Sequence, residues 1–147
     1  MEIVRAGLNH LDQLSGLFDG YRVFYKQAPD IQKARAFLKE RLENDESVIF
    51  VAEAEGGELL GFTQLYPLFS SVSARRVWLL NDLFVAKHAR RKGVAEMLME
   101  AARMFAIERG AKGLSLETGV DNTGAQALYE KLGYKKQDGT FWYFLGV

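Results

Sequence analysis

The spacing of hydrophobic residues changes character along the chain, and it begins with a helical pattern. In the first third, apolar residues recur every three or four positions, which is typical of amphipathic helices. We expect Asn9 to cap the first helix, with Asp12 three residues on. The apolar stripe of that helix consists of Leu11, Leu14, Leu17, Phe18, Tyr21, Phe24 and Tyr25. Pro29-Asp30 predicts the start of a second helix, whose inward positions are Ile31, Ala34, Leu38 and Leu42.

The middle of the chain has the composition of strands. Residues 47–54 are β-branched and apolar, residues 55–58 form a glycine-containing turn, and residues 59–66 resume the strand pattern. We interpret this segment as a hairpin. A polar loop at residues 70–74 then leads into a longer strand over residues 76–85, and residues 2–5 predict a short first strand.

The last third alternates between the two patterns. Residues 93–109 predict a helix that Gly110 ends, residues 112–118 a strand, and residues 122–132 a short helix closed by Gly133. Residues 134–137 and 141–145 predict a final pair of strands. The chain shows no repeat or linker, so we expect one domain over residues 1–147. Its fold class is α/β (α+β), with about seven strands in a mixed sheet and helices on both faces.

Composition and charge narrow the classes of function. The chain has 147 residues and no cysteine, which excludes disulfides, thiolate metal sites and a cysteine nucleophile, and we expect no metal site. Its 19 basic and 19 acidic residues give a formal net charge of +0, so we expect neither nucleic acid nor membrane as a partner. The N-terminus lacks the apolar core of a signal peptide, and we expect a cytoplasmic protein.

The most informative segment joins a predicted buried strand to the helix at residues 93–109. Arg90, Arg91 and Lys92 directly precede Gly93, where the helix opens. A helix start presents unpaired N–H groups and about half a positive charge, which attract anions. Gly93 and Ala95 are small enough for a ligand to approach the backbone. The alternative is a solvated basic surface at a helix start. The phosphate-binding patterns GxxxxGK[ST] and GxGxxG are both absent.

Two segments carry a family resemblance. The run Arg90-Arg91-Lys92-Gly93-Val94-Ala95 is similar to the R/Q-x-x-G-x-G/A signature of the GNAT N-acetyltransferase superfamily. Residues 122–134 resemble the second signature of that family, N-x-x-A-x-x-L-Y-x-x-x-G-F/Y. The two occur in the family's order with one strand between them, and the resemblance covers most of the chain. It implies a single-domain fold with a mostly antiparallel sheet and an enzyme that uses acetyl-coenzyme A.

The resemblance also assigns residues to the coenzyme. The pantetheine arm would pair with the strand edge at Leu83, Phe84 and Val85, for which an ordinary core strand is the alternative. The pyrophosphate would rest on the amides from Arg91 through Val94 to Ala95, close to the cationic side chains. The other side of the coenzyme would be lined by Asn122, Ala125 and Tyr129.

Two residues are candidates for moving protons. Tyr129 matches the family's usual general acid, which protonates the departing coenzyme A thiolate, and a core aromatic beside Leu128 and Leu132 is the alternative. Many relatives place a glutamate near Asn81, whereas this chain has Asn81-Asp82. Asp82 is a candidate base, directly or through water, or else a structural residue. Strand alternation predicts that Asn81 and Asp82 face opposite sides of the sheet.

The acceptor site in this family involves the first two helices and the loop between them. Tyr25 and Asn81 are the predicted contacts for the acceptor, although the aromatics near Tyr25 also have core spacing. The stretch LFDGYRVFYKQ, with LNDLFV later, resembles a subgroup that includes yeast histone and polyamine acetyltransferases. That resemblance favours a primary amine, in either a small molecule or a protein lysine.

Three functions compete for this sequence. The first is an N-acetyltransferase in which the amine attacks the thioester directly in a ternary complex. The second is a module of the same fold that binds acetyl-coenzyme A without turnover, and the third is a nucleic-acid binder using the basic loop. The neutral charge disfavours the third. The apolar run at residues 141–145 predicts a homodimer, because a bare apolar edge invites pairing.

Overall fold

A five-stranded sheet forms the centre of the first part of the molecule. The computed structural model describes residues 1–147, which divide into two compact units, Met1–Leu116 and Glu117–Val147. The strands of the first unit lie in sequence order and are β1 (Glu2–Arg5), β2 (Val48–Glu53), β3 (Leu59–Ser70), β4 (Arg75–Val85) and β5 (Gly113–Ser115). The first four pair antiparallel and β5 pairs parallel with β4, which confirms a mixed, mostly antiparallel sheet.

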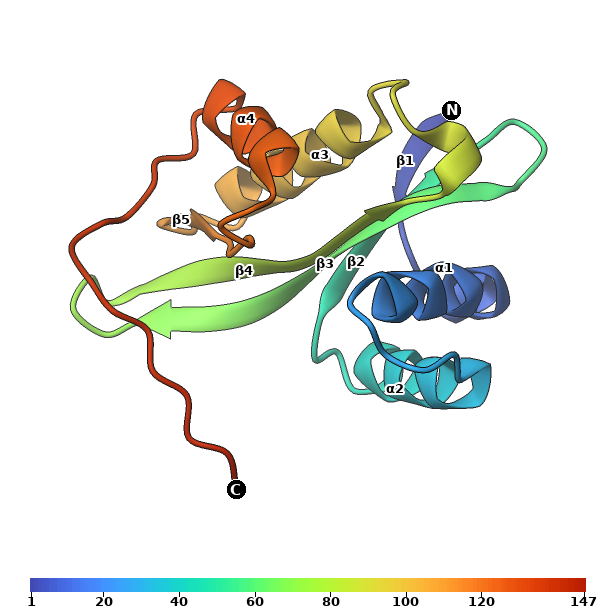
Figure 1. Ribbon diagram of the computed structural model, residues 1–147, viewed down its shortest axis with the longest axis horizontal. Coiled ribbons are helices and arrows are strands. Elements are labelled where there is room, and N and C mark those ends of the chain that lie inside the picture. The colour runs from blue at the N-terminus through green and yellow to red at the C-terminus, as the bar shows by residue number, and fades with distance from the viewer. The chain divides into compact units, whose positions relative to one another are not determined.

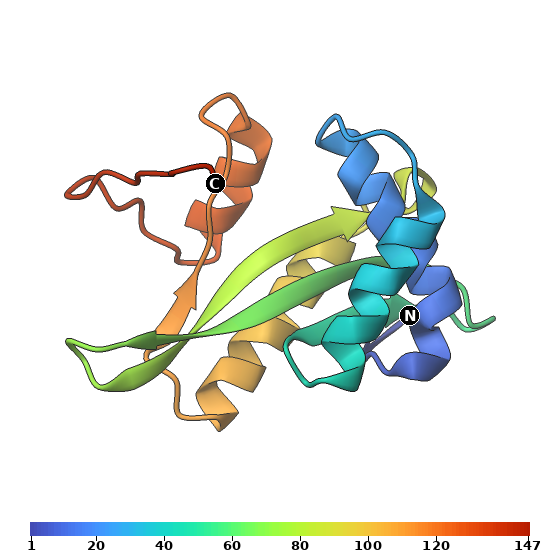
Figure 2. The same cartoon turned by 90° about the horizontal axis from the view of Figure 1, so that it is seen from below.

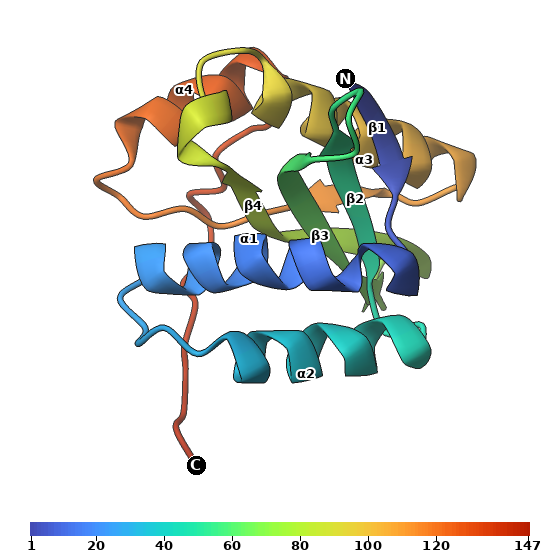
Figure 3. The same cartoon turned by 90° about the vertical axis from the view of Figure 1, so that its right-hand side faces the viewer.

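Helices cover both faces of this sheet, as predicted. Figures 1 and 3 show α1 (Leu11–Phe24) and α2 (Ile31–Glu43) on one face and α3 (Val94–Glu108) on the other. The start of α2 lies where Pro29-Asp30 predicts it, because the Asp30 carboxylate accepts a hydrogen bond from the Lys33 amide at 3.1 Å. None of the helices combines the length and the apolar composition needed to cross a bilayer.

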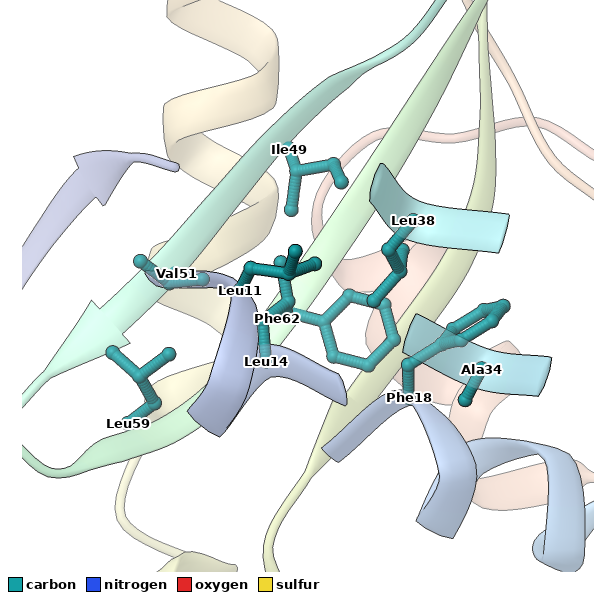
Figure 4. Packing of buried hydrophobic residues seen from close by; sticks show 9 residues of the cluster. All are labelled: Leu11, Leu14, Phe18, Ala34, Leu38, Ile49, Val51, Leu59 and Phe62. Carbon is teal, nitrogen blue, oxygen red and sulfur yellow. The ribbon is translucent and has the colours of Figure 1, made fainter. Parts of the chain in front are cut away.

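The main core lies between the sheet and the pair α1 and α2. Figure 4 shows side chains from α1, α2, β2 and β3 converging on the ring of Phe62, which is fully buried. The cluster consists of Leu11, Leu14, Phe18, Ala34, Leu38, Ile49, Val51, Leu59 and Phe62. On the opposite face, Val94 and Leu98 of α3 pack against Ala52 of β2. These contacts fix α1 and α3 on the two faces of β4, the strand that carries residues 81–85 of the predicted site.

Two details of the first helices differ from the prediction. Asn9 does not cap α1, because it lies in a short 3-10 turn (Leu8–His10) whose Gly7 amide donates to His10 Nδ1 at 3.0 Å. The inward stripe is also shorter than its spacing indicates. Phe24, Tyr25 and Ile31 are all exposed, because they lie beyond the part of each helix that the sheet covers.

The predicted pair of C-terminal strands is not formed. The second unit contains one helix, α4 (Thr123–Lys131), and residues 134–147 follow it without a strand, so the sheet has five strands rather than about seven. The strand predicted over residues 112–118 is also reduced to β5. A strand requires a neighbour that completes its hydrogen-bond ladder, and an isolated two-stranded hairpin is at best marginal in water. The side chains of residues 141–145 are accordingly 73–90% exposed.

Candidate active site

The second half of β4 has a strand neighbour on one side only. Pairing between β4 and β5 is limited to Val77 with Gly113, Trp78 with Leu114, and Leu79 with Ser115. Figure 2 shows β5 beside the beginning of β4, while β4 continues beyond β5 to its arrowhead with β3 as its strand neighbour. On the other side, Leu83, Phe84 and Val85 all pair with β3. Within the first unit, the predicted pantetheine strand therefore presents one open backbone edge, to which an extended ligand can hydrogen-bond.

A β-bulge interrupts β4 just before this edge. Asp82 is opposite Gln64 and Leu80 is opposite Leu65, so Asn81 is the extra residue and has no partner on β3. The bulge overrides the strict alternation that the sequence predicts. The side chains of Asn81 and Asp82 meet, with Asn81 Nδ2 donating to Asp82 Oδ1 at 2.7 Å. Asn81 is exposed, whereas only 2% of Asp82 is accessible to solvent.

The Asp82 carboxylate is the centre of a buried polar network. Gln64 Nε2 donates to its second oxygen, and Ser47 Oγ donates to Gln64 Oε1 at 2.8 Å. Burial raises the pKa of Asp82 above its ordinary value, and the hydrogen bonds from Gln64, Asn81 and Tyr21 oppose that shift. The carboxyl group is therefore a better proton acceptor than an exposed aspartate, but it reaches solvent only through its neighbours.

Tyr21 connects this network to the residues predicted for the acceptor. Its hydroxyl donates to the Asn81 carbonyl oxygen at 3.2 Å, and its ring lies 5.0 Å from that of Tyr25. Burial and the nearby Asp82 carboxylate raise the pKa of Tyr21, so its hydroxyl stays protonated at neutral pH. Tyr25 itself is 55% exposed at the end of α1. The structure thus brings Tyr25, Asn81 and Asp82 together, with Tyr21 between them.

The backbone after β4 forms a concave turn. Arg91 has φ +64° and Gly93 has φ +79°, whereas Lys92 between them has a negative φ. Successive residues with φ of opposite sign point their N–H groups into a common hollow, which is the geometry of an anion-binding nest. A left-handed conformation is unusual for arginine, so this turn carries backbone strain.

The amides of this turn are available to a ligand. The Arg90 amide donates to the Lys87 carbonyl and the Met97 amide to the Gly93 carbonyl, but the amides of residues 91–95 have no acceptor in the protein. A Cβ placed on Gly93 meets no atom within 4 Å, so the space beside it is open. The donors and the open space fit a pyrophosphate.

The three cations of the turn do not have the same role. Arg90 folds back along β4, where its Nε donates to the Val85 carbonyl at 3.0 Å and its guanidinium lies 5.5 Å from the centre of the Phe84 ring. Arg91 and Lys92 are exposed and pair with no carboxylate. Arg90 therefore holds the turn against the strand, while Arg91 and Lys92 supply positive charge near the free amides.

The residues predicted from the second signature lie in the second unit. Asn122 caps α4, because its Oδ1 accepts a hydrogen bond from the Ala125 amide at 3.2 Å. Tyr129 is on the same helix, partly buried, with its ring 6.2 Å from that of Tyr134. These contacts account for the start of α4 and for the packing of its aromatic pair.

Sequence reasoning missed the polar partners of Asp82. The sequence pattern predicts only a strand position for Gln64 and a position on the core stripe of a helix for Tyr21. A signal for Gln64 was present, because a glutamine between Phe62 and Leu65 in a buried strand needs a polar partner. No local pattern indicates that Tyr21 and Asn81 meet, since they are 60 residues apart.

The chain resembles proteins named as acetyltransferases along its whole length. Residues 14–134 match the acetyltransferase (GNAT) family. An uncharacterized N-acetyltransferase of Bacillus subtilis, YhfO, is 52% identical over 147 residues, covering 100% of this chain and 98% of the relative. The crystal structure of a probable acetyltransferase superposes with a TM-score of 0.95 at 45% identity, covering 100% of this chain and 98% of the other.

A more distant structure has the same fold. It is the aminoglycoside N-acetyltransferase AAC(6')-Iy in complex with coenzyme A, with a TM-score of 0.81 at 23% identity, and the match covers 98% of this chain and 93% of the other. Together with the open strand edge and the turn that follows it, these matches identify the chain as a member of the GNAT acetyltransferase family, whose enzymes are acetyl-coenzyme-A-dependent acyltransferases.

Proposed function

We propose that this N-acetyltransferase transfers the acetyl group of acetyl-coenzyme A to a primary amine of a small molecule, by direct attack in a ternary complex. The observation that carries the proposal is the turn at residues 91–95, whose unpaired amides follow directly on the open edge of β4. A diphosphate and an amide-containing arm are the two features of coenzyme A that such a surface recognises.

The proposed coenzyme contacts follow the chain from β4 into α3. The open edge at Leu83, Phe84 and Val85 would hydrogen-bond the pantetheine arm. The amides from Arg91 to Ala95 would hold the pyrophosphate, with Arg91 and Lys92 balancing its charge and Arg90 fixing the turn. Asn122, Ala125 and Tyr129 would contribute from the second unit, as the family resemblance implies.

The acceptor amine must lose a proton before it attacks. An amine with the pKa of lysine, near 10.4, is neutral in roughly one molecule in two thousand at pH 7, so deprotonation costs about 4–5 kcal/mol. Asp82 supports this step through its raised pKa and its connection to Asn81 and Tyr21. Because Asp82 is buried, we propose that the proton reaches it through water rather than by direct contact.

The leaving group, coenzyme A, needs a proton as it departs. Bond formation to the amine nitrogen breaks the carbon–sulfur bond and releases a thiolate. We propose that the Tyr129 hydroxyl donates to this sulfur, and that α4 positions the ring through the cap at Asn122. A phenol hydroxyl can donate a proton to a thiolate, which suits a tyrosine to this role.

The acceptor is proposed to bind beside Tyr25 and Asn81. Tyr25 offers an exposed aromatic face, which attracts a cationic amine, and Asn81 offers a polar group at the bulge. The aminoglycoside acceptor named for relatives of the same fold favours a small amine over a protein lysine.

We also propose that residues 1–147 act as one domain and that two copies associate through the segment at residues 141–145. The family match runs from residue 14 to residue 134 and so includes parts of both units. The exposed aromatic side chains of the C-terminal segment support association, since burial of apolar surface against a second copy is favourable.

A release assay tests the proposed reaction and its acceptor. Free thiol would be measured with acetyl-coenzyme A and polyamines, amino acids, amino sugars or lysine peptides, beside calorimetry with coenzyme A. We expect heat from coenzyme A and thiol release with at least one small amine. Heat without release for any amine would favour a non-catalytic module, and release with lysine peptides alone would overturn the small-amine assignment. The absence of heat from well-folded protein would overturn the proposed coenzyme site.

A further inference from the structure

A cavity lies near the beginning of β4. Its volume is about 650 Å³, and it is bordered by the residues after β1, the start of β2, the start of β4 and the end of α3. Trp78 lines this cavity and is seven residues from Val85 along β4, which corresponds to roughly 23 Å at about 3.3 Å per residue. The cavity is therefore separate from the turn that follows β4.

Three arginines surround an aromatic pair in this cavity. The rings of Trp78 and Phe105 meet edge to face at 5.0 Å. The guanidinium groups of Arg5 and Arg109 lie 5.6 and 5.0 Å from the centre of the Phe105 ring, and that of Arg76 lies 5.2 Å from Trp78. The charges are held over rings, a favourable arrangement that still leaves guanidinium N–H groups available.

These arginines have no carboxylate partner. Arg22, Arg35, Arg41 and Arg103 all form ion pairs within 4.0 Å, but Arg5, Arg76 and Arg109 form none. Asp45 is the one acidic residue that lines the cavity, against three arginines. The lining thus carries an excess of positive charge although the whole chain has a formal net charge of +0.

A buried donor in the same lining also lacks an acceptor. Trp78 is 8% exposed, and its indole Nε1 is buried without any hydrogen-bond partner in the protein. In folded proteins nearly all buried N–H groups are hydrogen-bonded, and an indole N–H can only donate. The indole lacks a hydrogen-bond acceptor in the protein, and the three guanidinium groups lack a carboxylate partner.

We propose that this cavity binds a small organic anion that carries a carboxylate or phosphate group. The anionic group would accept from the guanidinium groups of Arg5, Arg76 and Arg109, and a planar or aliphatic body would lie beside Trp78 and Phe105. This site is independent of acetyl transfer and does not rest on the proposed acceptor.

Trp78 provides a direct readout of binding. The chain has two tryptophans, so Trp142→Phe, a change at an exposed position, leaves Trp78 as the only one. In this variant we would follow Trp78 emission at constant ionic strength during titration with benzoate, phenyl phosphate and inorganic phosphate. Benzamide serves as a neutral match for benzoate. We expect a saturable change with the two organic anions, none with benzamide, and the same midpoint when coenzyme A is present at saturation.

Two sets of substitutions distinguish specific binding of the anion in this cavity from a nonspecific effect of positive charge. Arg5→Gln with Arg109→Gln should weaken binding at least about tenfold, since each charge-assisted hydrogen bond contributes on that order. Arg103→Gln removes the same charge from α3 outside the cavity and should change nothing.

Several results would overturn the proposal. One is a response of Trp78 emission to benzamide equal to that to benzoate, and another is a loss of anion binding in Arg103→Gln equal to that in the double variant. Displacement of the bound anion by coenzyme A, or Trp78 emission that does not respond to either organic anion, would also overturn it. A response to inorganic phosphate that matches phenyl phosphate would overturn the role of the aromatic pair. If Trp78 emission changes with protein concentration and not with added anion, the cavity is occupied by a second copy of the chain, and the proposal is overturned.

Discussion

At the scale of single residues, Asp82 shows how burial changes the chemistry of a side chain. A solvated aspartate is ionised and a poor proton acceptor at neutral pH. Burial in β4 raises the pKa of Asp82, while Gln64 and Asn81 donate hydrogen bonds that keep the carboxylate in one orientation. The same burial that makes the group a better acceptor also destabilises the folded protein when the group is charged.

This cost gives a prediction about stability and pH. Asp82 has a folded-state pKa above its ordinary value of 3.8, so its favourable contribution is complete at lower pH and is lost as the pH rises through the folded-state pKa. The difference in unfolding free energy between wild type and Asp82→Asn should therefore shrink as the pH increases across this window. Urea denaturation of both proteins at a series of pH values measures this difference in unfolding free energy. A difference that grows with pH would contradict the raised pKa.

Tyr129→Phe tests the proposed acid at the same scale. Loss of the hydroxyl should lower turnover by about 10²-fold or more, because general acid catalysis contributes on that order. The ring is retained, so we expect the affinity for acetyl-coenzyme A measured by calorimetry to stay the same. Tyr143→Phe is the matched control, since Tyr143 is an exposed tyrosine of the same unit. Equal turnover in the two variants would remove the assignment.

At the scale of elements, the site depends on how β4 ends and how α3 begins. The bulge at Asn81 and the short pairing with β5 leave an open edge, and the turn at residues 91–95 continues it with unpaired amides. Each feature uses a backbone conformation that an ordinary strand or helix does not supply. The backbone, more than the side chains, is what this region offers to a coenzyme.

Substitutions at the two glycines that flank α3 distinguish an effect on coenzyme binding from an effect on stability. Gly93 and Gly110 lie at opposite ends of α3, have φ of +79° and +66°, and would each place a Cβ in open space. Substitution by alanine should cost each site about 1 kcal/mol of backbone strain. Only Gly93→Ala should also weaken the binding of coenzyme A, by about tenfold or more, because it moves the amides that we propose bind the pyrophosphate. Calorimetry and thermal unfolding compare the two, and equal affinities would contradict the proposed turn.

Gly61 holds β3 close to the proposed pantetheine strand. A Cβ on Gly61 would lie 2.8 Å from the Phe84 carbonyl oxygen, a backbone atom that cannot move without shifting β4. Gly61→Ala should therefore destabilise the protein by about 1–3 kcal/mol, as overpacking usually does. Gly113→Ala in β5 is the control, because its Cβ meets nothing within 4 Å. Denaturant unfolding should show a clear loss for Gly61→Ala only, and equal losses would count against the close contact.

At the scale of the whole molecule, the C-terminal segment at residues 141–145 has apolar side chains that the rest of the chain does not cover. Phe141, Trp142, Tyr143, Phe144 and Leu145 all have exposed side chains, and no strand forms after α4. Five successive large apolar residues in water are unfavourable, and pairing with another copy would cover them.

Association through this segment is testable in solution. Light scattering at micromolar concentration should show a dimer for the wild type and a monomer for the combined variant Phe141→Ser, Tyr143→Ser and Leu145→Ser. The variant should keep its circular dichroism, because none of these side chains belongs to the core. A wild-type monomer, or a variant that stays dimeric, would place the interface elsewhere or remove it.

The sequence alone determined the features that depend on neighbours along the chain. The spacing of apolar residues located α1 to α4 and the strands of the first unit, because helical and strand periods are local properties. The glycine and cations before Val94 likewise indicated an anion-binding helix start, since the free amides there follow from helix geometry.

Tertiary structure decided the features that depend on which segments meet. The bulge at Asn81 exists only in the register of β4 against β3, and it reversed the prediction that Asn81 and Asp82 point apart. The contact of Tyr21 with Asn81 joins α1 to β4 over 60 residues. Strand propensity at the C-terminus produced no strand, because a strand is completed by its neighbour's hydrogen bonds and not by its own sequence.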